Sequence, residues 1–283
     1  MISVSFEVFP PKTDAGVAAL GEAVRRLAEL VPVYTSVTYG AGGGQRDKSF
    51  AAIDAVRQAA PHVPVAAHLT CVGQRRSDVE ATIERYAELG VRHIVALRGD
   101  PPEGIDAPYV AHPEGYQSTP ELVAAIAARG QFEIAVSAYP ERHPQSPSTD
   151  HDLDVLAAKV DAGATRAMTQ MFFDNAVFLR YRDQVAARRI AVDLVPGIFP
   201  IHAFDAVARF AARCGASMPA ELADVFAGDA SCTELAADLA ALQIAELAAE
   251  GVEHVHVYTL NKADLALAVC ARLGLTTPAG APA

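Results

Sequence analysis

Short apolar segments that end in polar or charged residues recur along the whole of this 283-residue chain. The clearest runs from Ile94 to Asp100, where IVAL is followed by an arginine, a glycine and an acid. Such a run is typical of a strand buried on both faces that carries charged groups at its carboxyl end. The same pattern predicts strands at the start of 5–13 and at 34–39, 65–69, 93–97, 133–139, 166–170, 193–197 and 254–258.

Each predicted strand precedes a segment with helical periodicity. In the first, apolar residues between Val17 and Leu30 recur at helical spacing, and Asp14 is placed to cap the helix. The spacing predicts further helices at 48–60, 77–89, 119–129, 152–162, 175–188, 202–214 and 262–273, with extra helical sequence at 219–227 and 231–250.

Eight strand–helix units in one chain predict an α/β fold, a (β/α)8 TIM barrel with extra helices before the last strand. We expect one barrel domain over 1–275 and a flexible tail over 276–283. An open doubly wound sheet is the alternative. It is less favoured because the glycine-rich run at 40–45, GAGGGQ, lacks the third glycine of a dinucleotide-binding turn. We interpret that run as a strand–helix loop.

Composition narrows the class of protein further. The chain is 51% hydrophobic and 20% charged, as expected of a globular domain with a sizeable core. Its net charge of −11 argues against nucleic acid or an anionic membrane surface as a partner. Its four cysteines form no C-x-x-C pair, and no stretch of about 18 apolar residues occurs. We therefore expect a cytoplasmic protein.

A barrel predicts where its site lies, because active sites of this fold form at the carboxyl ends of the strands. Polar residues follow the predicted strands at that end. Singly, each has an ordinary structural interpretation, such as a loop cap or a packed ring. Together they predict one site. They are Glu7, Thr38, His68, Arg98, Asp100, Tyr139, His143, Gln170, Tyr258 and Asn261.

Two carboxylates stand out within this set. Glu7 is flanked by Phe6 and Val8, so desolvation should favour its protonated form and suit it to act as a general acid. Asp100 follows Arg98 and Gly99, so a nearby cation should keep it ionised, while the glycine allows a planar ligand to approach. The alternatives are an ion pair inside the barrel for Glu7 and a helix or loop cap for Asp100.

Several motifs together resemble one known family. The chain is similar to the bacterial 5,10-methylenetetrahydrofolate reductases over nearly its whole length, in motif order and spacing. LRGDPP, AYPE-x-HP and TQ-x-FFD in one order are the most specific. The full set is SFEVFPPKT, VTYGAGGGQRD, HLTC, RHIVALRGDPP, SAYPERHP, KVDAGATRAMTQMFFD, VPGIFPI and HVYTLNKA.

The resemblance implies a barrel that holds FAD and reduces 5,10-methylenetetrahydrofolate to 5-methyltetrahydrofolate with NADH or NADPH. It implies a ping-pong mechanism that supplies methyl groups for methionine synthesis. Glu7 would then be the general acid that helps open the folate's five-membered ring. Asp100 would stabilise the resulting cation and tune the flavin, and Gln170 would hydrogen-bond the pterin.

The resemblance also assigns binding residues. A homo-oligomer is expected, with small molecules as the other partners. For FAD the implied residues are Thr38, Tyr39, His68, Arg98, Gly99, Asp100, Tyr116, Tyr139, His143, Asp152 and Lys159. For the folate or nicotinamide they are Asp100, Gln170, Phe204, Tyr258 and Lys262, where Phe204 also fits ordinary helix core.

Some features depart from the family pattern or extend it. Lys262 stands where many relatives have arginine and lacks the planar fork of a guanidinium. Val155 and Ala158 are apolar where relatives often place polar or basic groups near the cofactor. The loops at 101–118 and 140–151 have the length of functional binding loops.

Five other classes remain as alternatives. A metal-dependent hydrolase needs ligands drawn from His68, Asp100, His143, His254 and His256, the last two sharing one strand face. A Schiff-base aldolase needs a strand-end lysine, and no predicted strand contains one. A flavin-free reductase or a non-redox folate or pterin binder shares the barrel and pocket. A non-catalytic regulatory barrel leaves the acidic residues without a purpose.

Overall fold

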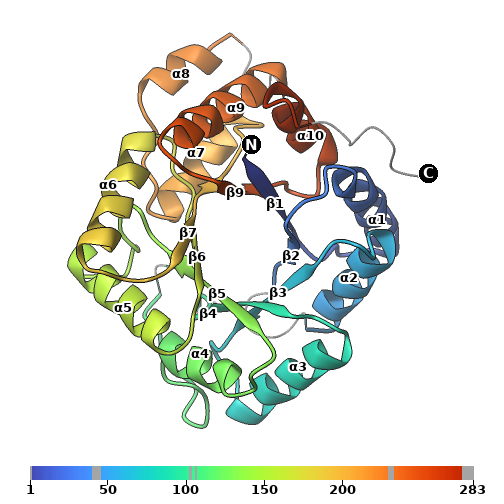
Figure 1. Ribbon diagram of the computed structural model, residues 1–283, viewed down its shortest axis with the longest axis vertical. Helices are drawn as coiled ribbons and strands as arrows, with labels where there is room; N and C mark the ends of the chain where they lie inside the picture. The colour runs from blue at the N-terminus through green and yellow to red at the C-terminus, as the bar shows by residue number, and fades with distance from the viewer. Residues whose placement is uncertain (1, 40–45, 102–103, 106, 229–232, 276–283) are drawn as a thin grey trace.

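Parallel strands form a barrel surrounded by helices in the computed structural model (Figure 1). The structure describes residues 2–39, 46–101, 104–105, 107–228 and 233–275. The glycine-rich run at 40–45 and the predicted tail at 276–283 lie outside them. The strands are β1 (Ser3–Val8), β2 (Thr35–Val37), β3 (Val65–Thr70), β4 (His93–Leu97), β5 (Glu133–Ala138), β6 (Arg166–Thr169), β7 (Asp193–Val195), β8 (Gly197–Ile198) and β9 (His254–Tyr258).

The ring of strands closes through one interrupted strand. Neighbours pair in chain order from β1 to β7, and β1 also pairs with β9. β7 pairs with β6, while β8 pairs with β9, so the segment 193–198 bridges the two sides. Pro196 separates its two halves and has no N–H to donate to a ladder. The predicted eight-stranded barrel is confirmed.

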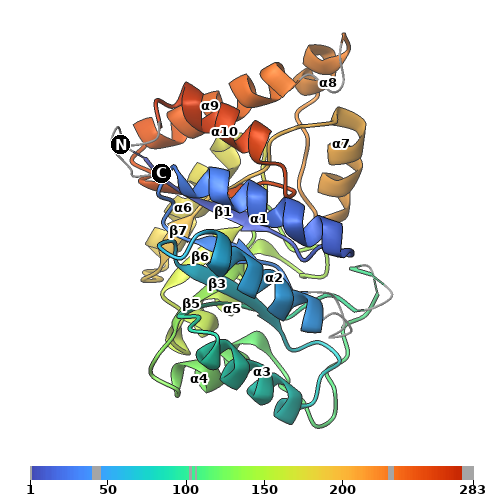
Figure 2. The same cartoon turned by 90° about the vertical axis from the view of Figure 1, so that its right-hand side faces the viewer.

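Helices cover the outside of the ring, and all of the predicted helical segments form. The extra helices α8 and α9 precede the last strand, and α7 and α8 stand at the end toward which the strands run (Figure 2). The described helices are α1 (Asp14–Ala28), α2 (Arg46–Ala59), α3 (Arg76–Glu88), α4 (Thr119–Ala127), α5 (Thr149–Asp161), α6 (Asn175–Ala187), α7 (Phe204–Arg213), α8 (Glu221–Phe226), α9 (Thr233–Ala249) and α10 (Ala263–Arg272).

The start of α1 corrects one detail of the sequence prediction. Thr13, not Asp14, is the N-cap, and its hydroxyl accepts a hydrogen bond from the backbone N–H of Gly16 at 3.2 Å. Asp14 lies in the first turn, where its charge complements the positive end of the helix dipole. Threonine and aspartate are both common N-cap residues, so the sequence alone could not decide which of the two adjacent positions caps the helix.

Two kinds of core hold the barrel together. Between the strands and helices lie continuous apolar clusters, in which Phe6 and Val8 of β1 pack on residues of the surrounding helices. Inside the ring, a small apolar cluster is formed by residues of β3 to β7 and by Tyr34, which precedes β2. That inner cluster consists of Tyr34, Ala66, Val95, Ala135, Met168 and Val195.

The other side of the barrel interior is polar. Successive strand residues face opposite sides of a sheet, so Ser5 and Glu7 face inward while Phe6 and Val8 face the helices. On β9 the same alternation turns His254 and His256 inward. Buried polar groups need hydrogen-bond partners, so this half of the interior requires a connected network.

Candidate active site

Glu7 lies between two histidines inside the carboxyl end of the barrel. Its Oε2 atom is 3.4 Å from Nε2 of His68 on β3 and 3.6 Å from Nε2 of His256 on β9. The Glu7 side chain is 19% exposed, and His256 is fully buried. The carboxylate therefore lies at the bottom of the site. It is partly exposed toward the mouth of the barrel, and His68 and His256 contact it from inside the barrel.

The charge state predicted for Glu7 is wrong. Burial raises the pKa of this carboxyl, but a hydrogen bond from His256 and the charges of His68 and His256 outweigh it and lower the pKa below 4.5. Burial lowers the pKa of His68, against the opposing pull of Glu7. At neutral pH Glu7 is a carboxylate, and it can act as an acid only after it has taken up a proton.

A chain of hydroxyl and imidazole groups continues below Glu7. His256 Nδ1 is 2.7 Å from the Ser5 hydroxyl, and its Nε2 is 3.3 Å from the Ser36 hydroxyl. The Ser5 hydroxyl also lies 2.9 Å from His254 Nε2. The sequence prediction missed Ser5 and Ser36 and considered His256 only as a metal ligand. Ser5 alternates with Glu7 on β1, and His256 alternates with His254 on β9, which was the signal that could have found these two residues.

A second group of charges gathers at the ends of β4 and β5. Arg98 Nη2 is 4.0 Å from Asp100 Oδ1, and its guanidinium lies 4.7 Å from the centre of the Tyr109 ring. Tyr139 stacks edge-on against His143 at 4.7 Å between ring centres. Burial and the charge of Asp100 raise the pKa of Tyr139 to about 12. The structure thus brings together predicted residues from two neighbouring strands.

Lys159 adds a buried cation to this group. It comes from α5, is 6% exposed, and donates to the backbone oxygen of Ser137 on β5 at 2.9 Å. Burial lowers its pKa to about 8, against the pull of Asp152. Asp152 accepts a hydrogen bond from the backbone N–H of His143 at 3.0 Å, which fixes the 140–151 loop to α5. Burial and the charge of Arg98 lower the pKa of His143.

Tyr258 on β9 is the register neighbour of Glu7 on β1. Its hydroxyl donates to the backbone oxygen of Thr169 on β6 at 2.9 Å, so the side chain crosses from β9 toward β6. Burial and the charge of Glu7 raise the pKa of Tyr258 well above its usual value. The phenol therefore stays neutral and serves as a fixed wall of the site.

The other predicted binding residues lie around this centre at different depths. Thr38 is partly buried at the end of β2, and the nearby Tyr39 hydroxyl lies 3.4 Å from the Gln74 side-chain oxygen, to which it donates. The Gln170 side-chain oxygen accepts the backbone N–H of Met171 at 3.0 Å. Phe204 begins α7 and stacks on Phe226, with 5.5 Å between ring centres.

Two predicted residues stand apart from the charged centre. Lys262 is exposed at the N-cap of α10. Burial and the positive charge of Lys262 lower the pKa of His202. Tyr116 is fully buried in the core between the barrel and its helices. Arg76 lies over its ring at 4.4 Å, and its hydroxyl donates to Glu80 at 3.3 Å. The structure does not bring Tyr116 to the site, because its ring anchors the loop on α3.

Gly99 is required by packing within the protein. Its φ is +82°, and a Cβ there would lie 2.5 Å from Val72 Cγ1 and 2.9 Å from Thr70 Cβ. Gly99→Ala therefore combines backbone strain with a clash, and we expect the free energy of unfolding to fall by about 2–4 kcal/mol. Urea unfolding measures this.

Gly73→Ala is the matched control for that variant. Gly73 has a φ of +64° but nothing within 4 Å of an added Cβ, so the substitution introduces strain alone. We expect it to cost about 1 kcal/mol. Equal losses in the two variants would show that the contact with Val72 and Thr70 does not constrain Gly99.

The residues of the metal-dependent hydrolase alternative are not gathered around one point. His254 and His256 both turn toward Ser5, whereas Asp100 and His143 belong to the group around Arg98. Within the described ranges, no cluster of three or more histidine, cysteine or acidic residues could hold a metal ion. In the same ranges, no helix has the length and apolar character needed to span a membrane.

Polar groups gathered at the carboxyl ends of barrel strands are the mark of a (β/α)8-barrel enzyme, and this chain falls in that class. The family model for methylenetetrahydrofolate reductase matches residues 1–274. The 5,10-methylenetetrahydrofolate reductases of Pectobacterium carotovorum subsp. carotovorum and Escherichia coli (strain K12) are each 40% identical to it, over 97% of this chain and 91% of theirs. The chain therefore belongs to the methylenetetrahydrofolate reductase family and is an oxidoreductase.

A solved structure is similar in fold alone. The crystal structure of a 2,3-dimethylmalate lyase aligns with a TM-score of 0.52 at 12% identity, covering 96% of this chain and 78% of that one. Barrels host unrelated reactions, so this likeness supports the architecture and carries no argument about substrate.

Proposed function

We propose that this protein reduces 5,10-methylenetetrahydrofolate to 5-methyltetrahydrofolate with NADH or NADPH through bound FAD, in a ping-pong mechanism that supplies methyl groups for methionine synthesis. The observation that carries the proposal is a carboxylate held by two histidines on the barrel floor, beside a cationic group at the mouth. Bound FAD would accept a hydride from the nicotinamide and pass it to the folate.

The residues at the mouth fit a large polar ligand such as FAD. Buried Thr70 Oγ1 makes no hydrogen bond within the described residues, and buried Arg98 Nη2 has only the carboxylate of Asp100, 4.0 Å away. Unpartnered buried groups are costly, and a ligand that pairs with them removes that cost. Arg98 and Lys159 supply positive charge for phosphate or for negative charge on the flavin ring. Tyr139 and His143 would complete this side of the site.

Glu7 is the proposed general acid. Opening the folate's five-membered ring requires a proton on the departing nitrogen and leaves an iminium cation on the other. Glu7 is positioned at the floor with His68 and His256 behind it, so its free face points toward the mouth. When the site is filled and water is excluded, burial weighs more heavily, and the carboxyl holds a proton more readily.

Asp100 is the proposed electrostatic partner of the iminium. Its side chain is 53% exposed at the mouth, and Arg98 is 4.0 Å away, which leaves the carboxylate able to turn toward a cation in the site. Gln170 at the end of β6 would hydrogen-bond the pterin. Its side-chain oxygen is held by Met171 N–H, so the amide nitrogen remains to donate. Phe204 and Tyr258 supply apolar walls.

The visible absorption spectrum of the purified protein tests the cofactor and both half-reactions. We expect a flavin spectrum that bleaches when NADH is added without oxygen and recovers when methylenetetrahydrofolate follows. A protein that stays colourless after incubation with FAD would contradict the proposal and favour a flavin-free reductase or a non-redox folate binder. Bleaching without recovery would exclude the folate as the oxidant.

A further inference from the structure

The polar chain below Glu7 reaches the opposite end of the barrel. From Glu7 Oε2 it is 3.6 Å to His256 Nε2, then 2.7 Å from His256 Nδ1 to the Ser5 hydroxyl, and 2.9 Å from Ser5 to His254 Nε2. Ser5 and His256 are fully buried. His254 is the first residue of β9 and lies at the amino end of the strands. This series of polar groups therefore crosses the barrel interior from one end to the other.

One arrangement of hydrogens satisfies every link. His254 Nε2–H donates to Ser5, and the Ser5 hydroxyl donates to His256 Nδ1. His256 Nε2–H lies between the Ser36 hydroxyl, at 3.3 Å, and Glu7, at 3.6 Å. In this arrangement all donors face Glu7, and Nδ1 of His254 is left as an acceptor at the far end.

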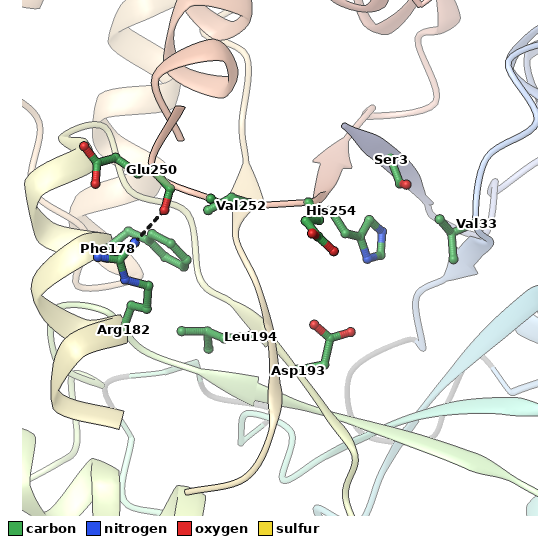
Figure 3. Close-up of a pocket in the computed structure, with 11 residues that line it drawn as sticks. Ser3, Val33, Phe178, Arg182, Asp193, Leu194, Glu250, Val252 and His254 are labelled. Atoms are coloured by element: carbon green, nitrogen blue, oxygen red, sulfur yellow. Dashed lines mark hydrogen bonds between the residues drawn. The ribbon is translucent and has the colours of Figure 1, made fainter. Parts of the chain in front are cut away.

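That far end opens into a cavity. His254 lines a cavity of about 360 Å³ together with Ser3, Asp193, Arg182 and Glu253. Figure 3 shows the His254 ring and the Asp193 carboxylate facing this space. A cavity of this size holds several water molecules, since one occupies about 30 Å³. The polar chain therefore has contact with solvent at the end away from the site.

The proposed reaction requires such a contact. Methylenetetrahydrofolate, one hydride and one proton give methyltetrahydrofolate, so each turnover consumes a proton through Glu7. Glu7 is a carboxylate at rest and must be reloaded. A flavin and a folate in the mouth would exclude water from the exposed part of the Glu7 side chain, and His68 and His256 are within 3.6 Å of its carboxylate.

Resting on that function, we propose that His254 is the entry point of a proton relay that reloads Glu7 from the amino-terminal end of the barrel, through Ser5 and His256. A proton from cavity water binds His254 Nδ1 while the Nε2 proton moves to Ser5. The Ser5 proton moves to His256 Nδ1, and the His256 Nε2 proton moves to Glu7. One N–H or O–H bond forms for each one broken, and both imidazoles end neutral with the proton on Nδ1. The hydrogens must return to the starting arrangement before the next turnover.

The surroundings of His254 favour transfer over storage of the proton. Burial and the charges of His256 and Arg166 lower the pKa of His254 to about 4, while Asp193 raises it. The ring therefore stays neutral at physiological pH and passes protons on without holding one. Tyr34 packs edge-on against it, with 5.8 Å between ring centres, and fixes its plane.

His254→Ala with added imidazole tests the relay. The variant should still be reduced by NADH at the wild-type rate, because that half-reaction does not use the Glu7 proton. Reoxidation by methylenetetrahydrofolate should slow about tenfold or more. Free imidazole, admitted by the enlarged cavity, should restore much of that rate, which a merely structural defect would not allow.

Two further variants separate the relay from general damage. Ser5→Ala cuts the chain at its middle, so it should slow reoxidation without rescue by imidazole. His93→Phe is the matched control. His93 also packs on Tyr34 at the amino end, but its Nδ1 pairs with Glu133 at 3.0 Å and lies outside the chain. An equal loss in His93→Phe, or no loss in His254→Ala, would overturn the proposal.

Nitrogen NMR of the histidines in the protein without flavin provides a readout independent of turnover. The His256 Nδ1 signal should move toward that of an unbonded nitrogen in Ser5→Ala, and should shift in His254→Ala but not in His93→Phe. Unchanged signals in both chain variants would overturn the relay. If the wild type does not reduce the folate but these NMR shifts appear, the proposed function is wrong, although the hydrogen bonds from His254 through Ser5 to His256 are present.

Discussion

Replacing Glu7 with glutamine is expected to stop folate reduction and to leave hydride uptake from NADH intact. Glutamine keeps the size of the side chain and can hydrogen-bond His256, but its amide is too weak an acid to transfer a proton to a departing nitrogen. Loss of a general acid lowers a rate by about 10²–10⁴-fold. Stopped-flow bleaching by NADH and recovery with methylenetetrahydrofolate measure the two half-reactions separately. Normal recovery would remove Glu7 from the acid role.

Glu133→Gln is the matched control for that experiment. Glu133 also pairs with a histidine, His93, but at the amino end of the barrel. We expect both half-reactions to keep their rates. The stability of Glu7→Gln gives a second check. Because the folded-state pKa of Glu7 is lowered, its carboxylate stabilises the fold above pH 4.5, and this contribution is lost as the pH falls. The stability gap between wild type and Glu7→Gln should therefore close in acid.

The charge state of Glu7 illustrates what sequence could not predict. Phe6 and Val8 adjoin Glu7 in the chain, but alternation along the strand turns both toward the helices. The real neighbours, His68 and His256, come from strands 61 and 249 positions away. Alternation along each strand predicts which face of the strand Glu7, His68 and His256 occupy. The distances from Glu7 to the two histidines depend on how the barrel closes. The effect of burial on the pKa of Glu7 was predicted, but the opposing effect of His68 and His256 was not.

Loop residues were harder to place than strand residues. The strands and helices followed from periodicity, since strands buried on both faces leave near-continuous apolar runs. Arg98, His143 and Lys159 came together because each lies beside a strand end or on a helix fixed to one. Tyr116 lies in a long loop, where no periodicity states which way a ring turns. Its contacts with Arg76 and Glu80 direct it into the core.

Replacing Lys159 with methionine is expected to weaken FAD binding and to stabilise the protein without FAD. A buried ammonium paired mainly with a backbone oxygen costs folding free energy, and methionine fills the same space without charge. We expect unfolding of the flavin-free variant to require about 1–2 kcal/mol more at pH 7. FAD affinity should fall about 10–100-fold, because a charge-assisted hydrogen bond is lost. Flavin fluorescence titration and urea unfolding measure the two effects.

The stability difference between the wild type and Lys159→Met should depend on pH. The pKa of Lys159 is about 8 in the folded protein, against 10.5 when exposed, so the cost of burying its charge is fully present below pH 8. Between pH 8 and 10.5 the folded protein releases this proton first, and the wild type gains stability relative to Lys159→Met. FAD affinity of the wild type should fall over the same range, as the cation disappears. Arg180→Met, which removes an exposed charge from α6, should change neither quantity. A wild-type FAD affinity that is constant from pH 7 to 10 would show that Lys159 does not hold the cofactor.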